Sequence, residues 1–288
     1  MSKPSKIVLK ITDDIDPAEV LCTTYQMRNF YAQLGDGLAT SLELMNYMQH
    51  HKASLMARSG DRVLDVCCGR GLMLPLLRWN RPKIASYTGV DIHPQNWLEA
   101  TRLSATKDIR AKRMAPNNIG SGEPYYPFNI NFLEANVASM AKPLRDLAWA
   151  PFDYVIYTSA IEHMQREDGA QSLAECYSVM KRGARLFLSS PNTADKRDPY
   201  DTQYAAHLYE WNANELTQEL LEIGFRIDQV FGILAKVKGY REKLAEHYPD
   251  LVATFDHFSE YMPSAWLYSL FPVITPGIAD EVVIVARR

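Results

Sequence analysis

The feature that most constrains the fold is the stretch from Arg62 to Gly71, in which a short apolar run stops at two closely spaced glycines. The apolar side chains of its first half suit a parallel strand that is covered on both faces. Gly69 and Gly71 then allow backbone dihedrals and a close ligand approach that a Cβ atom would prevent, and a helix is predicted from Leu72. A turn of this kind points backbone N–H groups at an anionic or polar ligand group. The stretch therefore predicts a strand, turn and helix of an α/β fold with a ligand site at the turn.

The glycine spacing separates two classes of cofactor. The dinucleotide fingerprint G-x-G-x-x-G, if it began at Gly69, would need a third glycine where Leu74 stands. The pattern present is Asp65-x-Cys67-x-Gly69-x-Gly71, an acidic residue followed by alternating small residues. It resembles the first motif of class I S-adenosylmethionine (SAM)-dependent methyltransferases, in which the acidic residue lies near the methionine ammonium. Cys67 stands where that family usually has glycine.

Composition limits the class of protein. The 288 residues, 47% of them hydrophobic and 23% charged, suffice for one elaborated α/β domain or one domain with a small cap. No apolar run approaches the roughly 18 residues of a membrane helix, and the N-terminus lacks the apolar core of a signal peptide, so we expect no membrane association and a cytoplasmic location. The formal net charge of -3 argues against a nucleic-acid partner. The four cysteines form no C-x-x-C pair, so we expect neither a metal site nor a disulfide framework.

A second buried strand is predicted over residues 87–92, and it carries an acidic residue near its end. Asp91 follows the glycine turn by roughly 20 residues, the distance at which a carboxylate can accept hydrogen bonds from ribose hydroxyls. The third predicted strand covers residues 130–137. In the resembled family this strand usually ends in an aspartate that accepts from the adenine amino group, and Asn136 occupies that place. Its amide oxygen can accept the same hydrogen bond without a charge.

The segment from Pro151 to Met164 predicts a fourth strand and the turn beyond it. It closely resembles the fourth motif of ubiquinone- and menaquinone-biosynthesis-type methyltransferases, in which the strand is followed by Glu-His, here Glu162 and His163. The motifs follow the family's order over residues 62–191. The resemblance implies a Rossmann-like, doubly wound α/β fold with a seven-stranded sheet whose last strand is antiparallel, and SAM as the cofactor. It implies these cofactor-binding residues: Asp65, Cys67, Cys68, Gly69, Gly71, Asp91, Ile92, Asn136, Val137, Thr158 and Ser159.

Two segments outside the motif series predict helical covers. We expect residues 1–57 to form an N-terminal helical cap and residues 58–288 to form the SAM-binding core. Within this core, residues 232–277 predict a helical insertion before the last strand that covers the substrate side. Aromatic residues concentrate in the insertion and in the loop 192–210. They fit an apolar or aromatic ligand, although packing of the covers onto the core would explain them equally well.

Local signals set further boundaries in the C-terminal half. Residues 172–183 predict a helix with basic residues in its last turn and Gly183 as its C-cap. A strand is predicted over residues 225–231. The β-branched run 282–285 suits a buried last strand.

The resulting hypothesis is a SAM-dependent methyltransferase whose substrate is a small, apolar or aromatic molecule. Because the sulfonium already activates the methyl group, the enzyme would mainly position an acceptor. His163 is a candidate general base, although Glu162 and His163 could instead anchor the turn by hydrogen bonds to the backbone. His207 is a second candidate for the same task. A SAM-binding regulator and a nicotinamide oxidoreductase remain alternatives, and a homo-oligomer is compatible with the sequence.

Overall fold

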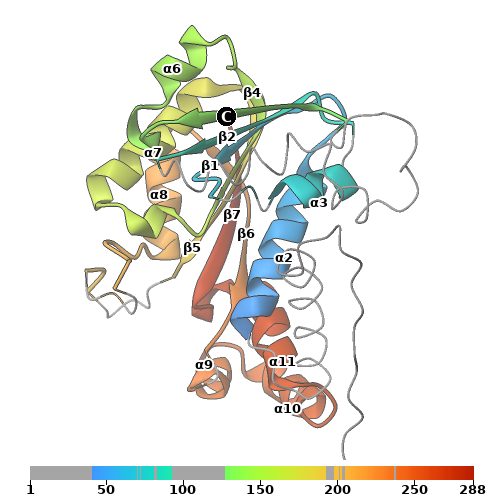
Figure 1. The fold of residues 1–288 in the computed structure, drawn as a ribbon. Helices are drawn as coiled ribbons and strands as arrows, with labels where there is room; N and C mark the ends of the chain where they lie inside the picture. Colours follow the sequence, from blue (N-terminus) through green and yellow to red (C-terminus); the bar gives the residue numbers. More distant parts are fainter. Residues whose placement is uncertain are drawn as a thin grey trace, which may run out of the picture. The chain divides into compact units, whose positions relative to one another are not determined.

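The structure, a computed structural model, describes residues 41–69, 71, 73–80, 83–92, 127–192, 198–200, 202, 205–236 and 238–288. The strands are β1 (Arg62–Val66), β2 (Ser86–Asp91), β3 (Asn129–Glu134), β4 (Phe152–Thr158), β5 (Met180–Pro191), β6 (Arg226–Leu234) and β7 (Glu281–Arg287). They form a seven-stranded sheet in the order β3-β2-β1-β4-β5-β7-β6 (Figure 1). β1 to β5 pair in parallel, and β7 runs antiparallel between β5 and β6. The predicted seven-stranded sheet with its antiparallel last strand is confirmed.

Helices cover both faces of this sheet, as the doubly wound prediction requires. The α-helices are α2 (Ser41–Met56), α3 (Met73–Asn80), α6 (Ala141–Asp146), α7 (Arg166–Val179), α8 (Ala213–Ile223), α9 (Tyr240–His247), α10 (Val252–Ser259) and α11 (Ser264–Leu270). The short 3-10 helices are η1 (Val137–Ser139), η2 (Ile161–His163), η3 (Pro249–Leu251), η4 (Phe271–Val273) and η5 (Pro276–Ile278). No helix among the described residues is long and apolar enough to cross a bilayer.

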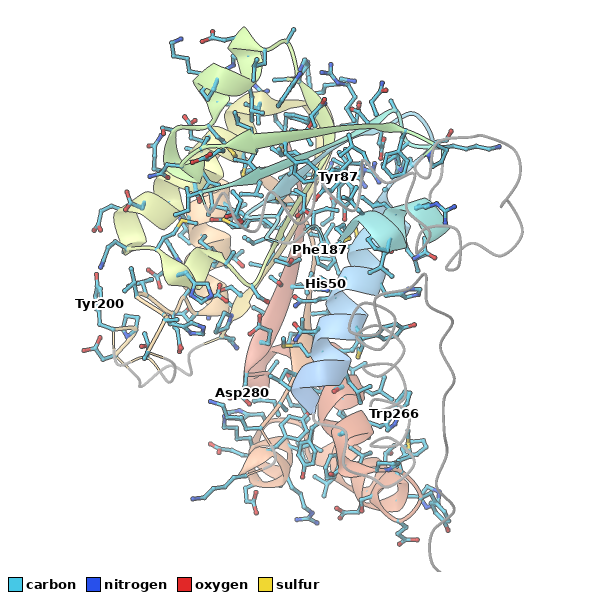
Figure 2. The ribbon with its side chains drawn as sticks, in the orientation of Figure 1. His50, Tyr87, Phe187, Tyr200, Trp266 and Asp280 are labelled. Atoms are coloured by element: carbon cyan, nitrogen blue, oxygen red, sulfur yellow. The ribbon has the colours of Figure 1, made fainter. Side chains whose placement is uncertain are left out.

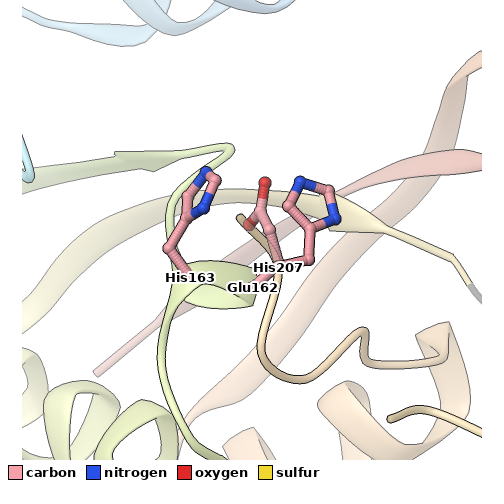
Figure 3. Close-up of side chains that lie close together, drawn as sticks. All are labelled: Glu162, His163 and His207. Atoms are coloured by element: carbon pink, nitrogen blue, oxygen red, sulfur yellow. The ribbon is translucent and has the colours of Figure 1, made fainter. Parts of the chain in front are cut away.

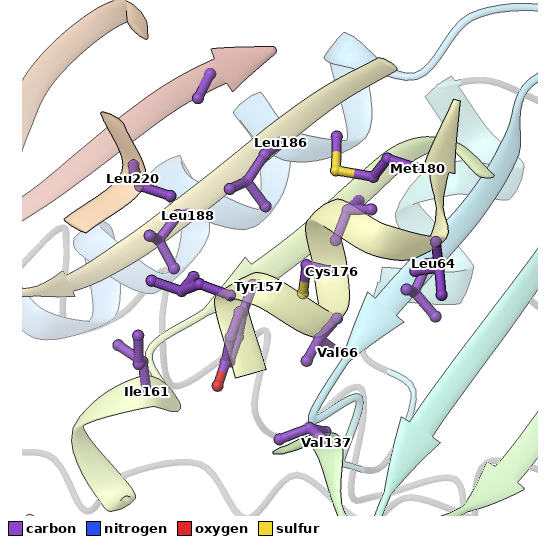
Figure 4. Close-up of a cluster of buried hydrophobic side chains, with 14 of the residues drawn as sticks. Leu64, Val66, Val137, Tyr157, Ile161, Cys176, Met180, Leu186, Leu188 and Leu220 are labelled. Atoms are coloured by element: carbon purple, nitrogen blue, oxygen red, sulfur yellow. The ribbon is translucent and has the colours of Figure 1, made fainter. Parts of the chain in front are cut away.

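Successive residues of the central strands enter two different cores. Leu64 and Leu186 belong to the core that α6, α7 and α8 cover (Figure 4). Their neighbours Val63 and Phe187 belong to the core on the other face, with residues of α2 and α3. Figure 2 labels Phe187 beside α2. Side chains alternate across a strand, so a strand covered on both faces is apolar at nearly every position. This explains why β1, β4 and β7 are almost continuous apolar runs in the sequence.

α2 forms part of the same compact unit as the sheet, which extends from Thr40 to Arg288. The hydroxyl of Tyr154 in β4 donates to the carbonyl of Ala53 in α2 over 2.8 Å. The predicted N-terminal cap lies outside the described residues over positions 1–40. Its existence as a separate cap therefore stays a prediction.

The segment between β6 and β7 is helical, as predicted, but β6 continues to Leu234 and the insertion begins after it. The insertion has a small apolar core of its own, in which the rings of Tyr240, Phe255 and Phe271 meet edge to face. α11 contacts α2, and η4 contacts β6. Most aromatic residues of the insertion that the structure describes thus pack within it.

The prediction of a helix over residues 172–183 was wrong at its C-terminal end. α7 ends at Val179 and β5 begins at the next residue. Gly183 has a φ of 78° inside β5, at a register shift of the pairing with β4, so it forms an irregularity in a strand and no helix cap. Lys181 pairs with Asp153 over 2.7 Å, next to the start of β4. Basic residues and a glycine are typical of a helix end, but here strand pairing with β4 took precedence.

Candidate active site

The glycine turn after β1 is held in a conformation that few side chains tolerate. Cys67, Gly69 and Gly71 have φ values of 55°, 51° and 73°. The φ of Cys67 shows that a left-handed residue is needed where the resembled family has glycine, and a cysteine adopts it at a conformational cost. The turn is tied to β2 because the N–H of Cys68 donates to the carbonyl of Val90 over 3.1 Å.

Asp91 lies at the end of β2, next to this turn, as the sequence predicted. Its side chain is 6% exposed and its Oδ2 accepts from the N–H of Gly69 over 2.9 Å. Ile92, the next residue, is 55% exposed. The carboxylate is thus held at the sheet edge by the turn itself.

Asp65, the acidic residue of the first motif, is buried in β1. Its Oδ2 accepts from the hydroxyl of Tyr87 over 2.6 Å. Burial raises the pKa of Asp65 to about 7, the Tyr87 hydrogen bond lowers it in part, and the charge of Asp91 raises it further. A nearby ammonium would relieve this unfavourable burial of negative charge.

The third strand ends earlier than predicted, at Glu134, and Asn136 begins the next helical turn. The Oδ1 of Asn136 accepts from the N–H of Ala138 over 2.9 Å and so caps η1, with Val137 buried behind it. An amide oxygen has two lone pairs, so this cap leaves room for a second donor such as an adenine amino group.

β4 ends at Thr158, and Ser159 follows with a φ of 45°. The N–H of Ser159 donates to the hydroxyl of Ser189 over 3.1 Å, and its own hydroxyl donates to Oε1 of Glu281 over 3.3 Å. Gln49 of α2 donates to the same hydroxyl over 3.1 Å. Ser159 therefore joins the ends of three strands and α2 at one point. The sequence predicted Ser159 but neither Gln49 nor Glu281.

A cavity of about 470 Å³ opens at this edge of the sheet, where β4, β5 and β6 end and β7 begins. Its acidic lining residues are Glu162, Glu210, Asp280 and Glu281. The insertion and the end of β6 add Lys236, Lys238 and Lys243. Apolar contacts come from Met45, Leu234 and Tyr240. Figure 2 shows Asp280 at this end of the sheet. The cavity is thus rich in charge.

Glu162, Glu210 and Glu281 are the buried carboxylates of this lining, and the pKa is raised at Glu162 and at Glu281. Glu162 is 2% exposed, and burial raises its pKa to about 8. Glu281 is 6% exposed, and burial, followed by the charge of Glu162, raises its pKa well above the usual range. The signal for Glu281 was present in the sequence as an acidic residue directly before the β-branched run, but a strand end alone does not tell which partners it meets.

The structure brings His163 and His207 together, although they come from different segments. Their ring centroids are 4.9 Å apart, with the rings nearly perpendicular. The Nδ1 of His163 is 2.9 Å from the carbonyl of Ala206, and the Nδ1 of His207 is 2.6 Å from Oε1 of Glu210. Glu162, His163 and His207 offer ligand atoms within 4.8 Å of one another (Figure 3), whereas the prediction that no metal is bound was based on the cysteines alone.

The strand order, the helices on both faces and the glycine turn define the class of protein. It is a Rossmann-like α/β protein, and in this class ligands bind outside the carboxyl ends of the strands.

Comparison with known proteins narrows this class. A family model described as a methyltransferase domain matches residues 43–230, more than half of the chain, and the chain therefore belongs to this methyltransferase-domain family. A probable S-adenosylmethionine-dependent methyltransferase of Mycolicibacterium smegmatis is 33% identical over 109 residues, which cover 38% of this chain and 39% of the relative. One of Mycobacterium tuberculosis is 35% identical over 101 residues, which cover 35% and 34%. The matched segments span less than two fifths of these relatives.

Solved structures agree in fold. The methyltransferase chain from a Haloferax volcanii complex of the Trm112 methyltransferase activator with a putative methyltransferase has a TM-score of 0.51 at 16% identity, over 90% of this chain and 96% of that chain. A small RNA methyltransferase has a TM-score of 0.53 at 14% identity, over 86% and 25%. At these identities the likeness shows the fold alone. The family and the names of the relatives confirm the prediction of a methyltransferase domain with SAM as its cofactor.

Proposed function

We propose that the protein transfers the methyl group of SAM to a small molecule held in the cavity between η2 and the insertion. The observation that carries this proposal is the position of Ser159, which belongs to the predicted cofactor set and also lines the cavity. An acceptor in the cavity would therefore lie next to the cofactor. The volume of about 470 Å³ is in the range of small-molecule sites, roughly 300–1,000 Å³.

The cofactor would be held by the turn and the strand ends on the other half of the edge. Asp91 would accept from the ribose hydroxyls, and Asn136 from the adenine amino group. Asp65 would lie near the methionine ammonium, with Gly69 and Gly71 allowing close approach of the backbone. The sulfonium supplies an electrophilic methyl group, and the chain's task is to hold an acceptor in line with it.

The lining of the cavity supports an acceptor of mixed character. Met45, Leu234 and Tyr240 would contact its apolar or aromatic body. The lysines and carboxylates would contact polar or charged groups, which the sequence had not led us to expect. Lys236, Lys238 and Tyr240 come from or adjoin the insertion, which supports the proposal that it covers the substrate side.

His163 has two candidate roles, an anchor of the turn after β4 and a general base. The hydrogen bond to Ala206 supports an anchoring role, since it ties the turn after β4 to the loop that carries His207. A general base would use Nε2. If the neutral ring donates from Nδ1 to Ala206, the lone pair that can accept a proton is on Nε2.

The test is methyl transfer from isotopically labelled SAM to a small-molecule extract fractionated by size. We expect label in a fraction of low molecular mass, followed by identification of the product by mass spectrometry. SAM binding in calorimetry without any labelled product would favour a SAM-binding regulator instead. Hydride transfer with NAD(P)H and no SAM binding would favour the oxidoreductase alternative.

A further inference from the structure

Glu162, His163 and His207 converge from two segments onto one wall of the cavity. Figure 3 shows the carboxylate of Glu162 beside the two imidazole rings, and the ligand atoms of all three residues lie within 4.8 Å of one another. We propose that these three side chains hold a divalent transition-metal ion whose remaining coordination positions face the cavity. The metal site is independent of the proposed function, but its use in catalysis rests on that function.

The hydrogen bonds of both histidines select the tautomer that a metal requires. A carbonyl and a carboxylate oxygen can only accept, so the Nδ1 of His163 donates to Ala206 and the Nδ1 of His207 donates to Glu210. In the neutral rings the lone pair is then on Nε2, which becomes the ligand atom. Metal-binding histidines commonly donate their other N–H to a backbone carbonyl or a carboxylate in this way. Both types of partner are present here.

Glu162 provides an observation that does not depend on the histidines. Its Oε2 is buried and has no hydrogen-bond partner among the described residues. A buried carboxylate oxygen without a donor is costly, and Glu281 adds a second buried acid nearby. A cation bound to Glu162 would satisfy this oxygen and offset the clustered negative charge.

The two segments are fixed to each other by the backbone. The carbonyl of Glu162 accepts from the N–H of Leu208 over 2.8 Å and from that of Tyr209 over 3.3 Å. The N–H of Glu210 donates to the carbonyl of Pro199 over 3.0 Å. His207 is therefore held opposite η2 before any ion binds. Ligand atoms of a tetrahedral zinc ion are roughly 3.3 Å apart, given bond lengths of about 2.0 Å, so small side-chain rotations would close the site.

The donor set restricts the ion. Two imidazoles and one carboxylate suit Zn²⁺, Fe²⁺ and similar ions, whereas Mg²⁺ and Ca²⁺ prefer oxygen ligands alone. Three protein ligands also leave a position for a further ligand, as in catalytic zinc sites. An acceptor hydroxyl bound there would lose its proton to solvent more easily. Its oxygen would then form the bond to the methyl carbon while the sulfur–methyl bond breaks and its electron pair returns to sulfur. In this arrangement the Nε2 of His163 binds the ion and is not the general base.

The test uses the full chain without a histidine tag, stripped with a chelator and then titrated with Zn²⁺ in competition with a coloured chelator. We expect one high-affinity ion per chain. Glu162→Gln and His207→Ala should each weaken binding by at least a hundredfold, and Glu210→Ala, which removes the acceptor behind His207, by roughly 10- to 100-fold. His247→Ala is the matched control, because His247 is exposed on α9, and should leave the affinity unchanged.

Circular dichroism and thermal unfolding of each variant show whether it folds, and calorimetry with S-adenosylhomocysteine tests the cofactor site separately. Absence of stoichiometric Zn²⁺ binding by folded protein, or equal affinity in the Glu162→Gln, His207→Ala and His247→Ala variants, would overturn the metal site. Preference for Mg²⁺ over Zn²⁺ would overturn the choice of ion. Loss of Zn²⁺ binding in folded variants that still bind the cofactor product supports the proposal. Failure of every form to bind SAM would instead count against the proposed function.

Discussion

The two halves of the sheet's carboxyl edge differ in how their polar groups are satisfied. At β1 and β2 the buried acids have local partners, since Asp91 accepts from Gly69 and Asp65 accepts from Tyr87. At β4, β5 and β7, Glu162 and Glu281 are buried close together, and Oε2 of Glu162 has no partner among the described residues. The two acids of the first half thus have partners within the protein, whereas Oε2 of Glu162 in the second half has none among the described residues and could accept from a ligand or bind an ion.

The two halves of the edge are proposed to hold different ligands. The half at β1 and β2 is proposed to hold the cofactor, and the half at β4, β5 and β7 is proposed to hold the acceptor and an ion. Ser159 lies at the boundary between them. Substitutions in one half should then change one property and leave the other largely unchanged.

The largest expected effect is in the second half. His163→Ala should lower kcat by roughly a hundredfold or more at saturating SAM, because a base contributes about 10²- to 10⁴-fold and loss of a metal ligand would be at least as severe. SAM affinity should change by less than about twofold, which corresponds to under 0.5 kcal/mol, because His163 lies outside the half that is proposed to hold the cofactor. Steady-state kinetics with the identified acceptor measures this. A parallel loss of SAM affinity would contradict the division into halves, and a full Zn²⁺ content in the variant would favour the base.

Asp91→Ala should act on the first half. Loss of a charged hydrogen bond to ribose weakens binding by about 1.5–3 kcal/mol, or roughly 10- to 150-fold. Calorimetric titration with S-adenosylhomocysteine measures it. Asp146→Ala is the control, because Asp146 is exposed on α6 in a surface ion pair. Equal affinities of the two variants would remove Asp91 from the cofactor site.

Gly89→Ala should destabilise the strand below the turn without adding any charge. A Cβ at Gly89 would lie 2.7 Å from Sγ of Cys68 and 3.0 Å from the ring of Phe132, so the turn or the ring must move. Overpacking of this kind costs about 1–3 kcal/mol in free energy of unfolding. Urea denaturation measures it. Gly69→Ala is the comparison, because a Cβ there meets nothing within 4 Å and only the φ of 51° is unfavourable. A larger loss for Gly69→Ala would contradict the packing argument.

The smallest expected effect concerns protons at Asp65. Burial raises its pKa to about 7, and an ammonium would lower it, so SAM binding should release part of a proton at pH 7. Because only the deprotonated carboxylate pairs with the ammonium, SAM affinity should rise about tenfold between pH 6 and pH 8. Calorimetry in two buffers of different ionisation enthalpy detects the proton, and Asp65→Asn should abolish the pH dependence.

Without a ligand, the raised pKa of Asp65 has the opposite pH dependence in protein stability: it stabilises the folded state more at low pH than at high pH. An acid whose pKa is higher in the folded state binds more protons folded than unfolded. Its contribution to the free energy of unfolding is therefore greatest below about pH 4 and falls as the pH rises through about 7. A stability profile of the wild type against Asp65→Asn separates this effect from that of other groups.

Much of the fold could be predicted from the sequence because its signals are local. The glycine turn after β1 and the β-branched run of β7 each depend on residues close together in the chain. Where a local signal competed with long-range pairing, the prediction failed, as at the start of β5. There the residues after Val179 pair with β4 despite the basic residues and glycine that are typical of a helix end.

The candidate site divides in the same way. The sequence by itself determined the local structure of the half that we propose to hold the cofactor, since Gly69 and its partner Asp91 are 22 residues apart within one strand–turn–helix–strand unit. Only the tertiary structure decided the other half, where His163 meets Ala206 over 43 residues and Ser159 meets Glu281 over 122. Such contacts form because strands distant in the chain pair side by side and bring their ends to one edge. No local pattern in a sequence encodes which of those ends become neighbours.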